Sequence, residues 1–448
     1  MTMEAMDNGR AFPAIAESQR WMARARNLIP ACTQTLAKGP TQWVQGVAPQ
    51  FIRRAKAAHV WDVDGNEYID LNMGIGPISL GYGYPRVDEA IRAQLADGIT
   101  FSLVHPLEVE VAEAVREAVP CADQVRFSKT GADAVSAAVR VARAFTGRDR
   151  VMCCGYHGWH DWYIGVTSRP AGVPAGVRDD VSTFEYNDLA SVEAGLDEQT
   201  ACVVLEPMVF DFPKNDFLIA LREICSRNGS LLIFDEMWTG FRWALGGAQE
   251  AFGVIPDLAC FSKAVSNGMP LSILAGRADV MSLLDQDVFF FTTFGGEALS
   301  LAAAKATIAE MRERHVPAAL AASGAKLAAG FNRLAADRGL AGIAECVGHP
   351  ARTMIKLGGT TEDPLLLKSL LQQEMIRRGV LWGGFHNMCF SHTEEDIERV
   401  LDAYDQSLSV LRSALDAGQV RRRLQGEPVQ AIFRKTGSFN MKPRIKRS

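Results

Sequence analysis

The chain alternates short apolar runs with longer segments whose apolar residues recur at helical spacing. The short runs are predicted to be strands, and they cover 125–128, 150–154, 201–206, 230–235, 258–262 and 271–276. Two segments between such runs, 132–146 and 215–228, are predicted to be amphipathic helices. Strands that alternate with helices favour an α/β fold with a mostly parallel central sheet.

After residue 297 the pattern changes to long helices, the first two of them rich in alanine. These helices are predicted over 297–313, 317–337, 363–378 and 394–414. Thr393, which is followed by two glutamates, is a good N-cap with acids in the first turn. The change of pattern predicts a large domain over 86–335 and a smaller α+β domain in two parts. The first part, 1–85, begins with an N-terminal arm, and the second, 336–448, ends in a basic tail.

The composition is typical of a globular protein and excludes several classes of function. Of the 448 residues, 48% are hydrophobic and 22% are charged, unlike a disordered chain. The net charge of −5 lacks the basic surplus of a dedicated nucleic-acid binder. Neither a membrane-spanning run nor a secretory signal is recognisable. The nine cysteines are scattered and contain no C-x-x-C pair, so we expect reduced thiols and a cytoplasmic location.

The charge is unevenly distributed along the chain. Residues 421–448 hold nine Lys or Arg and one acid, whereas the first 420 residues carry a net charge of −13. A solvated C-terminal arm would account for the tail. The alternative is that its cations face the acidic body of a partner subunit or an anionic substrate. The cations in question are Arg421, Arg422, Arg423, Arg434 and Lys435.

Polar residues follow the predicted strands, at the sheet edge where open α/β proteins bind ligands. Thr130 and Gly131 follow the first run and begin a helix, which suits either a phosphate or an ordinary helix cap. Asp235 and Glu236 end another run and are either functional acids or caps of a turn. Lys263 follows an apolar strand, and desolvation in a cleft would make it a nucleophilic amine.

The block GYHGWHD at 155–161 adds aromatic rings and two histidines. His157 and His160 are three residues apart, but no H-E-x-x-H motif or cysteine accompanies them, and no metal site is predicted. A phosphate cradle, a buried amine, a carboxylate and a flat aromatic ring are together what pyridoxal 5′-phosphate requires. The sequence contains no G-x-G-x-x-G, Walker A or G-x-S-x-G motif that would support a competing interpretation.

Three blocks resemble the class III aminotransferases of pyridoxal-phosphate fold type I, and within them the branch of glutamate-1-semialdehyde 2,1-aminomutase. FDEMWTGFR (234–242) resembles the D-E-V-x-T-G-F-R block, and PDLACFSKAVSNGMPLS (256–272) resembles the Schiff-base lysine block. FTTFGGEAL (291–299) resembles the loop whose threonine reaches the cofactor phosphate of the neighbouring subunit. The likeness extends from 38–43 to 389–400. It implies that the large domain binds pyridoxal phosphate and that the protein is a homodimer.

The resemblance also implies roles for individual residues. Lys263 would form the internal aldimine and move a proton, while Asp235 would keep the pyridine nitrogen protonated. Tyr156 would stack on the cofactor ring, Met237 would cover its other face, and Glu206 would support Asp235. The phosphate ligands would be Thr130, Gly131 and Ala132, with Thr293 from the neighbouring subunit.

Some positions depart from the family's pattern. The usual N-S-G-T-E-A segment reads KTGADA, which places Lys129 before the phosphate turn and removes one hydroxyl at Ala132. Glu297 and Ala298 stand where Asn and Pro are common, which adds an acid near the expected subunit boundary. Trp238 replaces a glutamine that touches the ring hydroxyl in many relatives.

The leading hypothesis is an aminotransferase that passes an amino group from an amino-acid donor, with glutamate expected, to an aldehyde or ketone. The alternatives are a glutamate-1-semialdehyde-type 2,1-aminomutase, a racemase on the same site, and a catalytically silent relative that serves as a scaffold. We expect small-molecule substrates as partners, and neither nucleic acid nor membrane. The residues nominated as substrate neighbours are Ser102, His105, Trp159, Trp238 and His386.

Overall fold

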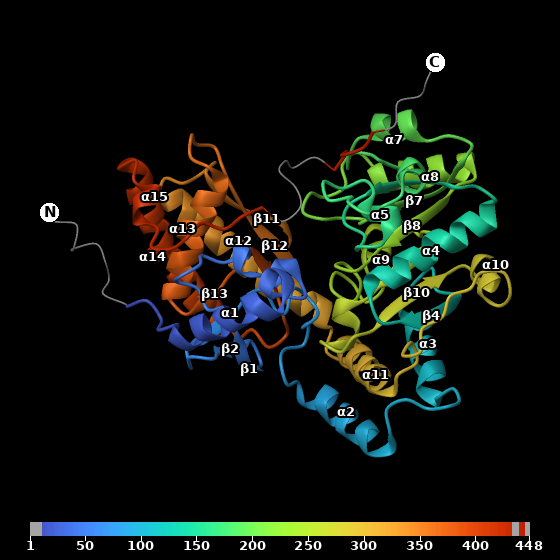
Figure 1. Ribbon diagram of the computed structural model, residues 1–448, viewed down its shortest axis with the longest axis horizontal. Coiled ribbons are helices and arrows are strands. Elements are labelled where there is room, and N and C mark those ends of the chain that lie inside the picture. Colours follow the sequence, from blue (N-terminus) through green and yellow to red (C-terminus); the bar gives the residue numbers. More distant parts are fainter. Residues whose placement is uncertain (1–10, 432–438, 444–448) are drawn as a thin grey trace. The chain divides into compact units, whose positions relative to one another are not determined.

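A computed structural model describes residues 11–431 and 439–443, which divide into two compact units (Figure 1). Unit 1 takes in the described residues of Met1–Ile75, Leu80–Tyr84 and Ala319–Ile432. Unit 2 takes in those of Gly76–Ser79, Pro85–Ala318 and Phe433–Ser448. The domain ranges 1–85, 86–335 and 336–448 stay a prediction.

Unit 2 is built around a seven-stranded sheet with the order β4-β10-β9-β8-β7-β5-β6. Its strands are β4 (Gln124–Ser128), β5 (Arg150–Cys154), β6 (Val181–Thr183), β7 (Thr200–Leu205), β8 (Leu231–Asp235), β9 (Leu258–Phe261) and β10 (Ser272–Gly276). The pairs from β6 to β9 are parallel, and only β10 runs antiparallel to both of its neighbours. The expected α/β fold with a mostly parallel sheet is therefore confirmed.

The helices of unit 2 surround this sheet. They are α2 (Pro85–Asp97), α3 (Pro106–Ala118), α4 (Gly131–Thr146), α5 (Asp161–Ile164), α6 (Ala175–Asp179), α7 (Leu189–Gly195), α8 (Phe217–Asn228), α9 (Ala248–Phe252), α10 (Ala278–Met281) and α11 (Ala298–Glu313). Two 3-10 turns, η5 (Lys263–Ser266) and η6 (Ser282–Leu284), complete the unit.

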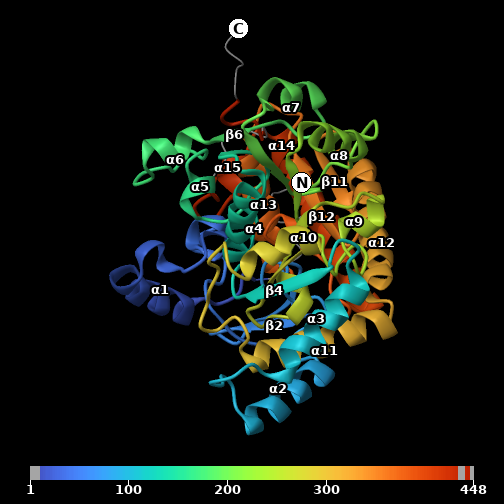
Figure 2. The same cartoon turned by 90° about the vertical axis from the view of Figure 1, so that its right-hand side faces the viewer.

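Helix α4 explains why the central strands lack charge. Figure 1 and Figure 2 both show it against the sheet, and its alanine and valine side chains pack on alternate residues of β5 and β7 to β10. The strand residues that point the other way are also buried. Strands that are covered on both faces are expected to be continuously apolar, and these strands were predicted from such apolar runs.

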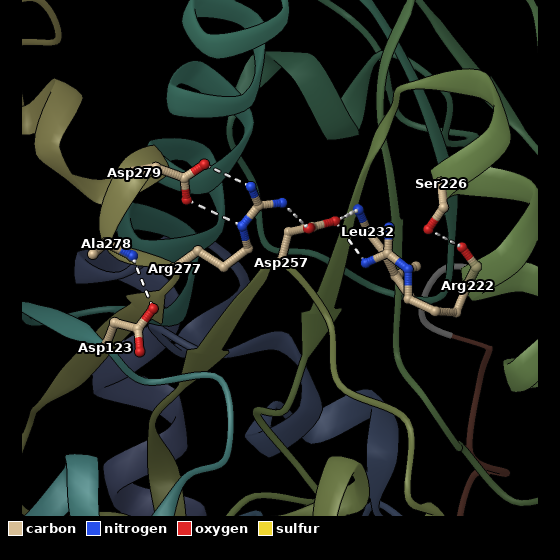
Figure 3. A network of polar contacts seen from close by, with 8 residues as sticks. All are labelled: Asp123, Arg222, Ser226, Leu232, Asp257, Arg277, Ala278 and Asp279. Carbon is tan, nitrogen blue, oxygen red and sulfur yellow. Dashed lines mark hydrogen bonds and ion pairs between the residues drawn. The ribbon is translucent and has the colours of Figure 1, made fainter.

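A network of ion pairs lies at the sheet edge from which β9 starts (Figure 3). Asp257 accepts hydrogen bonds from Arg222 at 2.7 Å, from Arg277 at 2.6 Å and from the Leu232 backbone at 2.7 Å. Arg277 also pairs with Asp279. This network therefore joins α8, β8 and the loop after β10 at the edge opposite to the carboxyl ends of β8 and β9.

Unit 1 holds two smaller sheets, with the orders β1-β2-β3-β13 and β11-β12-β14. The strands are β1 (Ile52–Lys56), β2 (His59–Asp62), β3 (Glu67–Asp70), β11 (Ala344–His349), β12 (Arg352–Leu357), β13 (Val380–Leu381) and β14 (Phe385–Asn387). The helices are α1 (Ala16–Leu28), α12 (Val316–Asp337, in unit 1 from Ala319), α13 (Pro364–Arg377), α14 (Glu394–Asp416) and α15 (Val420–Arg423), with 3-10 turns η2 (Pro30–Cys32), η3 (Leu36–Lys38) and η4 (Pro40–Gln42). Thr393 caps α14 through a capping box with Asp396, as predicted.

The basic tail is described only in part. Arg434 and Lys435 lie outside the described residues, while Arg421 pairs with Glu427 at 3.5 Å. Residues 439–443 lie beside β6, where Thr183 donates its backbone N–H to the Lys442 carbonyl. In the described chain, no helix combines the length and the apolar character that a bilayer span requires.

Candidate active site

The paired acids after β8 have different roles. Asp235 is buried; its Oδ1 accepts the Met237 backbone N–H at 3.1 Å, and its Oδ2 lies 2.8 Å from His157 Nδ1. Glu236 points away and accepts the backbone N–H groups of Ala248 and Gln249, which are the first two residues of α9. Burial raises the pKa of Glu236 to about 7. Glu236 therefore binds the start of α9, whereas Asp235 lines the pocket described below, and its role as a functional acid stays a prediction.

His157 contacts the Asp235 carboxylate, and the sequence did not predict this contact. Its Nε2 lies 3.2 Å from the Cys154 carbonyl, and its Nδ1 faces the Asp235 carboxylate. The ring therefore lies between the Asp235 carboxylate and a backbone carbonyl. No spacing rule connects residues 157 and 235, because the loop after β5 and the end of β8 meet only in the folded sheet.

Lys263 follows β9 and begins the turn η5 with φ at +49°, in the left-handed region that a non-glycine residue rarely adopts. Its Nζ lies 3.9 Å from the centroid of the Trp238 ring, a cation–π distance. Trp238 in turn packs against Gly76, where a Cβ would come within 2.4 Å of the indole. The indole that replaces the family's glutamine therefore holds the amine of the site.

The turn from β4 into α4 is the segment for which a phosphate cradle is predicted. Thr130 caps α4 by a capping box in which its hydroxyl oxygen accepts the Asp133 N–H at 3.2 Å. Gly131 is held close to Met237, because a Cβ there would lie 2.7 Å from the sulfur. A Cβ on Gly158 would likewise lie 2.6 Å from the Ala132 methyl group. The site therefore depends on glycine at 131 and 158.

Tyr156 and Glu206 are joined through the backbone. The Tyr156 N–H donates to Glu206 Oε2 at 3.2 Å. The Tyr156 ring is 43% exposed and packs edge-on against Tyr163. Burial of the phenol, together with the negative charges of Asp235 and Glu206, raises the pKa of Tyr156. This tyrosine therefore presents a neutral ring to the pocket.

One pocket of about 210 Å³ brings these residues together. Of the predicted site residues it is lined by Gly131, Ala132, Tyr156, Glu206, Asp235, Met237 and Lys263. His157, Gly158, Ser262 and two of the nominated substrate neighbours, Trp159 and Trp238, also line it. Thr130 is the cap behind the cradle, and Thr293 lies in an exposed turn before α11.

The other nominated substrate neighbours do not line this pocket. His105 is the N-cap of α3 and accepts the Leu107 N–H at 3.2 Å, and the nearby Ser102 is exposed in the preceding loop. His386 is fully buried, with its ring nitrogens bonded to Thr353 and Tyr404, so its nomination as a substrate contact is wrong. It is a core histidine, and burial lowers its pKa to about 3.

The two histidines of the GYHGWHD block have separate partners. His160 Nδ1 lies 2.7 Å from the Ser136 hydroxyl, whereas His157 faces Asp235. Within the described residues, no cluster of three or more His, Cys, Asp or Glu side chains is arranged to hold a metal ion.

Lys129 and Glu297, two departures from the family's pattern, form an ion pair at 2.9 Å. Their side chains are only 17% and 11% exposed. The Glu297 carboxylate also accepts hydrogen bonds from the Leu299 N–H and the Ser300 hydroxyl and so caps α11. Burial opposes the charge of Glu297, but the hydrogen bonds from Ser300 and Lys129 outweigh burial and lower its pKa. The pair therefore ties the phosphate turn to the turn that carries Thr293.

The pocket fits pyridoxal phosphate. Glycines at 131 and 158 leave space that a Cβ would fill, the start of α4 offers backbone N–H groups to a phosphate, and a buried carboxylate and an amine lie in the same pocket. The nature of the fold and the pocket together define an α/β enzyme of the pyridoxal-phosphate fold type I class.

Comparison with known proteins gives the family. The model of the family described as aminotransferase class-III matches residues 42–348, and the chain belongs to this family. The 3-aminobutyryl-CoA aminotransferase of Cloacimonas acidaminovorans is 33% identical over 90% of this chain and 99% of its own. The glutamate-1-semialdehyde 2,1-aminomutase of Archaeoglobus fulgidus is 34% identical over 88% and 99%.

A solved structure agrees with this assignment. The FumI protein of Sphingopyxis sp. MTA144, in its PLP internal aldimine form, superposes with a TM-score of 0.83 at 30% identity and covers 92% of this chain and 98% of its own. The chain is therefore a class III enzyme whose cofactor is pyridoxal 5′-phosphate. The expected family, fold and cofactor are confirmed.

Proposed function

We propose that this enzyme transfers an amino group from an amino-acid donor, glutamate in the first instance, to an aldehyde or ketone acceptor. The observation that carries the proposal is the pocket in which the Lys263 amine and the Asp235 carboxylate lie together, with His157 hydrogen-bonded to Asp235 at 2.8 Å. An amine and a buried anion at the carboxyl ends of neighbouring strands are what proton transfer at a substrate carbon requires.

Each of these residues has a defined task in the proposal. Bound pyridoxal phosphate supplies a ring that accepts the electron pair released when a substrate Cα–H bond breaks. Asp235 would hold a proton on the ring nitrogen, and His157 orients that carboxylate through the hydrogen bond of 2.8 Å. Lys263 takes the Cα proton at Nζ and returns it. Once protonated, Nζ is stabilised by the cation–π contact with the Trp238 ring, whose centroid lies 3.9 Å away.

The remaining site residues position the cofactor. Backbone N–H groups of Gly131 and Ala132 bind the phosphate at the start of α4, where the helix dipole favours an anion. The hydroxyl of Thr130 supports this turn as the helix cap. Tyr156 and Met237, which both line the pocket, would hold the cofactor ring between them. Glu206 fixes the Tyr156 backbone and, through it, the loop that carries His157.

We also propose that the working form is a homodimer in which Thr293 of one subunit donates to the phosphate in the other. Phe289, Phe291 and Phe294 beside Thr293 are 77%, 69% and 57% exposed, and Leu103 and Val104 are more exposed still. The Ala298 N–H donates to the Ile99 carbonyl, which brings the two apolar segments together. Contiguous apolar patches on a surface favour coverage by another protein chain.

A second candidate, the 2,1-aminomutase, is favoured by the 34% identity to the Archaeoglobus fulgidus aminomutase. Both candidates use the same pocket.

Adding glutamate to the purified holoenzyme distinguishes the transferase from the mutase. In a transferase the visible absorbance of the cofactor decreases, and one keto acid is released per site without an acceptor. A mutase releases none, and it converts an amino-aldehyde to its positional isomer with no second substrate. Release of no keto acid from any amino donor contradicts the transferase proposal.

The proposal also covers the cellular location and the domain ranges. We propose a cytoplasmic location, supported by nine cysteines that form no disulfide bond in the structure, eight of them buried, as expected in a reducing compartment. We also retain the domain ranges 86–335 for the cofactor domain and 1–85 with 336–448 for the smaller domain.

A further inference from the structure

The edge strand β6 of the seven-stranded sheet is covered by a short segment of the basic tail. Residues 439–443 lie beside this strand, and both belong to unit 2 (Figure 2). Thr183 donates its backbone N–H to the Lys442 carbonyl at 2.9 Å, and the Lys442 N–H donates to the Thr183 hydroxyl oxygen at 2.6 Å. An edge strand offers unpaired backbone groups to other extended segments, and here the tail takes those of Thr183.

Polar side chains recognise the first residues of the segment. The Glu185 carboxylate accepts the backbone N–H groups of Phe439 and Asn440, at 2.9 and 3.0 Å. The hydroxyl of Thr183, a residue that is only 5% exposed, donates to Asn440 Oδ1 at 3.0 Å. Hydrogen bonds to a carboxylate are stronger than those between neutral groups. The contact therefore combines backbone pairing with side-chain hydrogen bonds that depend on the residues of the segment.

Lys442 extends the contact to α6. Its Nζ donates to the Arg178 carbonyl and lies 4.0 Å from Asp179 Oδ1. Arg178 and Asp179 are the last two residues of α6, where a cation is favoured because it meets the carbonyl ends of the final turn. Arg178 also packs against Gly165, the residue after α5, where a Cβ would lie 2.9 Å from the arginine Cγ. The segment therefore joins β6 to the helices that follow the GYHGWHD block.

Contacts within the sheet lead from this edge to the pocket. Thr183 is in register with Cys153 of β5, and the Phe184 N–H donates to the Cys153 carbonyl at 3.3 Å. The next residue of β5, Cys154, has its carbonyl 3.2 Å from His157 Nε2. The end of β6 therefore supports the end of the strand that positions His157.

We propose that the outer edge of β6 is a peptide-binding site whose ligand is the chain's own segment 439–443, and that this segment acts as a removable strap. While bound, the strap holds the end of β6 and α6 and steadies the loop 155–161, which carries Tyr156 and His157. Segments held at the surface open at a lower free energy than core strands, so the strap can leave while the sheet stays folded. Its binding does not depend on the reaction proposed for the pocket.

The first test supplies the strap as a separate molecule. A variant that lacks residues 439–448 should bind a labelled peptide of that sequence, as measured by fluorescence anisotropy. The full chain should bind it at least about tenfold more weakly, because its tethered segment competes at an effective concentration of about millimolar. A scrambled peptide of the same composition should bind poorly. Equal binding of the two peptides overturns the proposal, because it shows only the attraction of a basic peptide to a body with a net charge of −13.

Substitutions in the deletion variant locate the peptide on β6. Thr183→Val keeps the shape of the side chain but removes the hydroxyl, and it should weaken peptide binding by about fivefold or more, as for two neutral hydrogen bonds. Glu185→Ala should weaken it by about tenfold to a hundredfold, since it removes hydrogen bonds to a charged group. Ser182→Ala in the same strand is the matched control and should change nothing. Unchanged affinity in both Thr183→Val and Glu185→Ala overturns the assignment.

Hydrogen exchange of the holoenzyme gives a second readout, which does not measure turnover and so stands apart from the proposed reaction. Deletion of 439–448 should quicken exchange at 178–186 and at 155–161 by at least about threefold, and saturating peptide should reverse the change. Deletion of 444–448 keeps the strap and should leave both segments as they are. Should the longer deletion fail to fold, Thr183→Val in the full chain replaces it, with the same pattern expected. Exchange that is unchanged at 155–161 overturns the link to the pocket.

Discussion

Lys263 is the residue on which the proposed chemistry depends most directly. Lys263→Ala is expected to lower turnover by at least about a hundredfold, because a positioned base contributes about 10²–10⁴-fold. Borohydride treatment of the wild type should attach the cofactor to the tryptic peptide that contains Lys263, as read by mass spectrometry, and should attach none in the variant. A cofactor label at another lysine of Lys263→Ala would contradict the assignment.

His157 acts through Asp235 and is a positioning residue. His157→Phe leaves the buried Asp235 without its side-chain donor, and the expected fall in kcat is about tenfold to a hundredfold, as for the loss of a hydrogen bond to a charged group. The absorbance titration of the bound cofactor should shift in the same variant, which a purely structural defect would not cause.

His157→Asn provides the matched control for this prediction. Its amide N–H can replace Nδ1 as donor to Asp235, so it should recover part of the rate and most of the titration behaviour. Equal behaviour of the Phe and Asn variants would show that the contact with Asp235 is not what matters at this position.

At the scale of elements, the Lys129–Glu297 pair links the turn before α4 to the start of α11. Lys129→Met, Glu297→Gln and the double variant form a cycle whose coupling energy is expected at about 0.5–3 kcal/mol, the range for residues in contact. Denaturant unfolding of the holoenzyme measures it. Because the pKa of Glu297 is lowered, its stabilisation is present above the ordinary glutamate value and is lost as the pH falls, so the coupling should shrink in acid.

Coupling that is equal at neutral and at acidic pH would show that the pair does not depend on the charge of Glu297. The single variant Glu297→Gln is expected to cost more than Lys129→Met, since it also weakens the cap of α11.

His59 on β2 ties down the start of α14 in unit 1. Its ring lies 3.0 Å from Asp396 and 2.8 Å from Glu67, and the hydrogen bond to Asp396, which outweighs burial, raises the pKa of His59. The stabilisation is therefore full below the ordinary histidine pKa and is lost as the pH rises through the raised value.

Hydrogen exchange at the first turn of α14 should consequently quicken between pH 6 and pH 9, beyond the intrinsic effect of pH. His59→Gln should remove this extra dependence. The exposed His315 of unit 2 gives a control, and His315→Gln should leave the dependence at α14 unchanged. An extra dependence that persists in His59→Gln would assign it to another group.

How well the sequence predicts an element depends on how that element is buried. The strands β4 to β10 apart from β6 were predicted to within one residue. For β7 to β10 the reason is that strands covered on both faces leave uninterrupted apolar runs. The three-residue β6 and the two-residue β13 are too short to leave a pattern. Helix α3 was not predicted, and its N-cap is a histidine, His105, which is not one of the usual capping residues.

At the site, a residue was predicted when a local sequence pattern marks its position and was missed when none does. Asp235 ends a strand, and Lys263 and Gly131 follow strands closely, so a search at the carboxyl ends of the strands found them. The contact of His157 with Asp235 joins parts of the chain 78 residues apart, and no local pattern records it. His386 was misplaced because a histidine that is satisfied in a core and one that faces a substrate look alike in a sequence.

At the scale of the whole molecule, the proposed second subunit explains several exposed features at once. Thr293 lies among exposed phenylalanines and lines no part of its own subunit's pocket among the described residues. Lys263 and Asp235 line one pocket within a single chain, whereas the predicted phosphate cradle has lost a hydroxyl at Ala132. A donor from another copy would restore that contact, which makes cofactor affinity, and not the proton transfer itself, the property that the dimer controls.

Complementation between two defective chains tests this arrangement. Lys263→Ala lacks the amine, and Thr293→Ala lacks the phosphate donor, so each homodimer should be impaired at limiting cofactor concentration. If Thr293 acts across the interface, a mixed dimer contains one intact site, which has Lys263 from one chain and Thr293 from the other. An equal mixture that has exchanged subunits should then recover about a quarter of the wild-type rate, since half of the dimers are mixed and each has one good site.

Native mass spectrometry confirms the exchange. If the mixture gains nothing over the average of its components once mixed dimers are present, Thr293 serves its own subunit or no site at all.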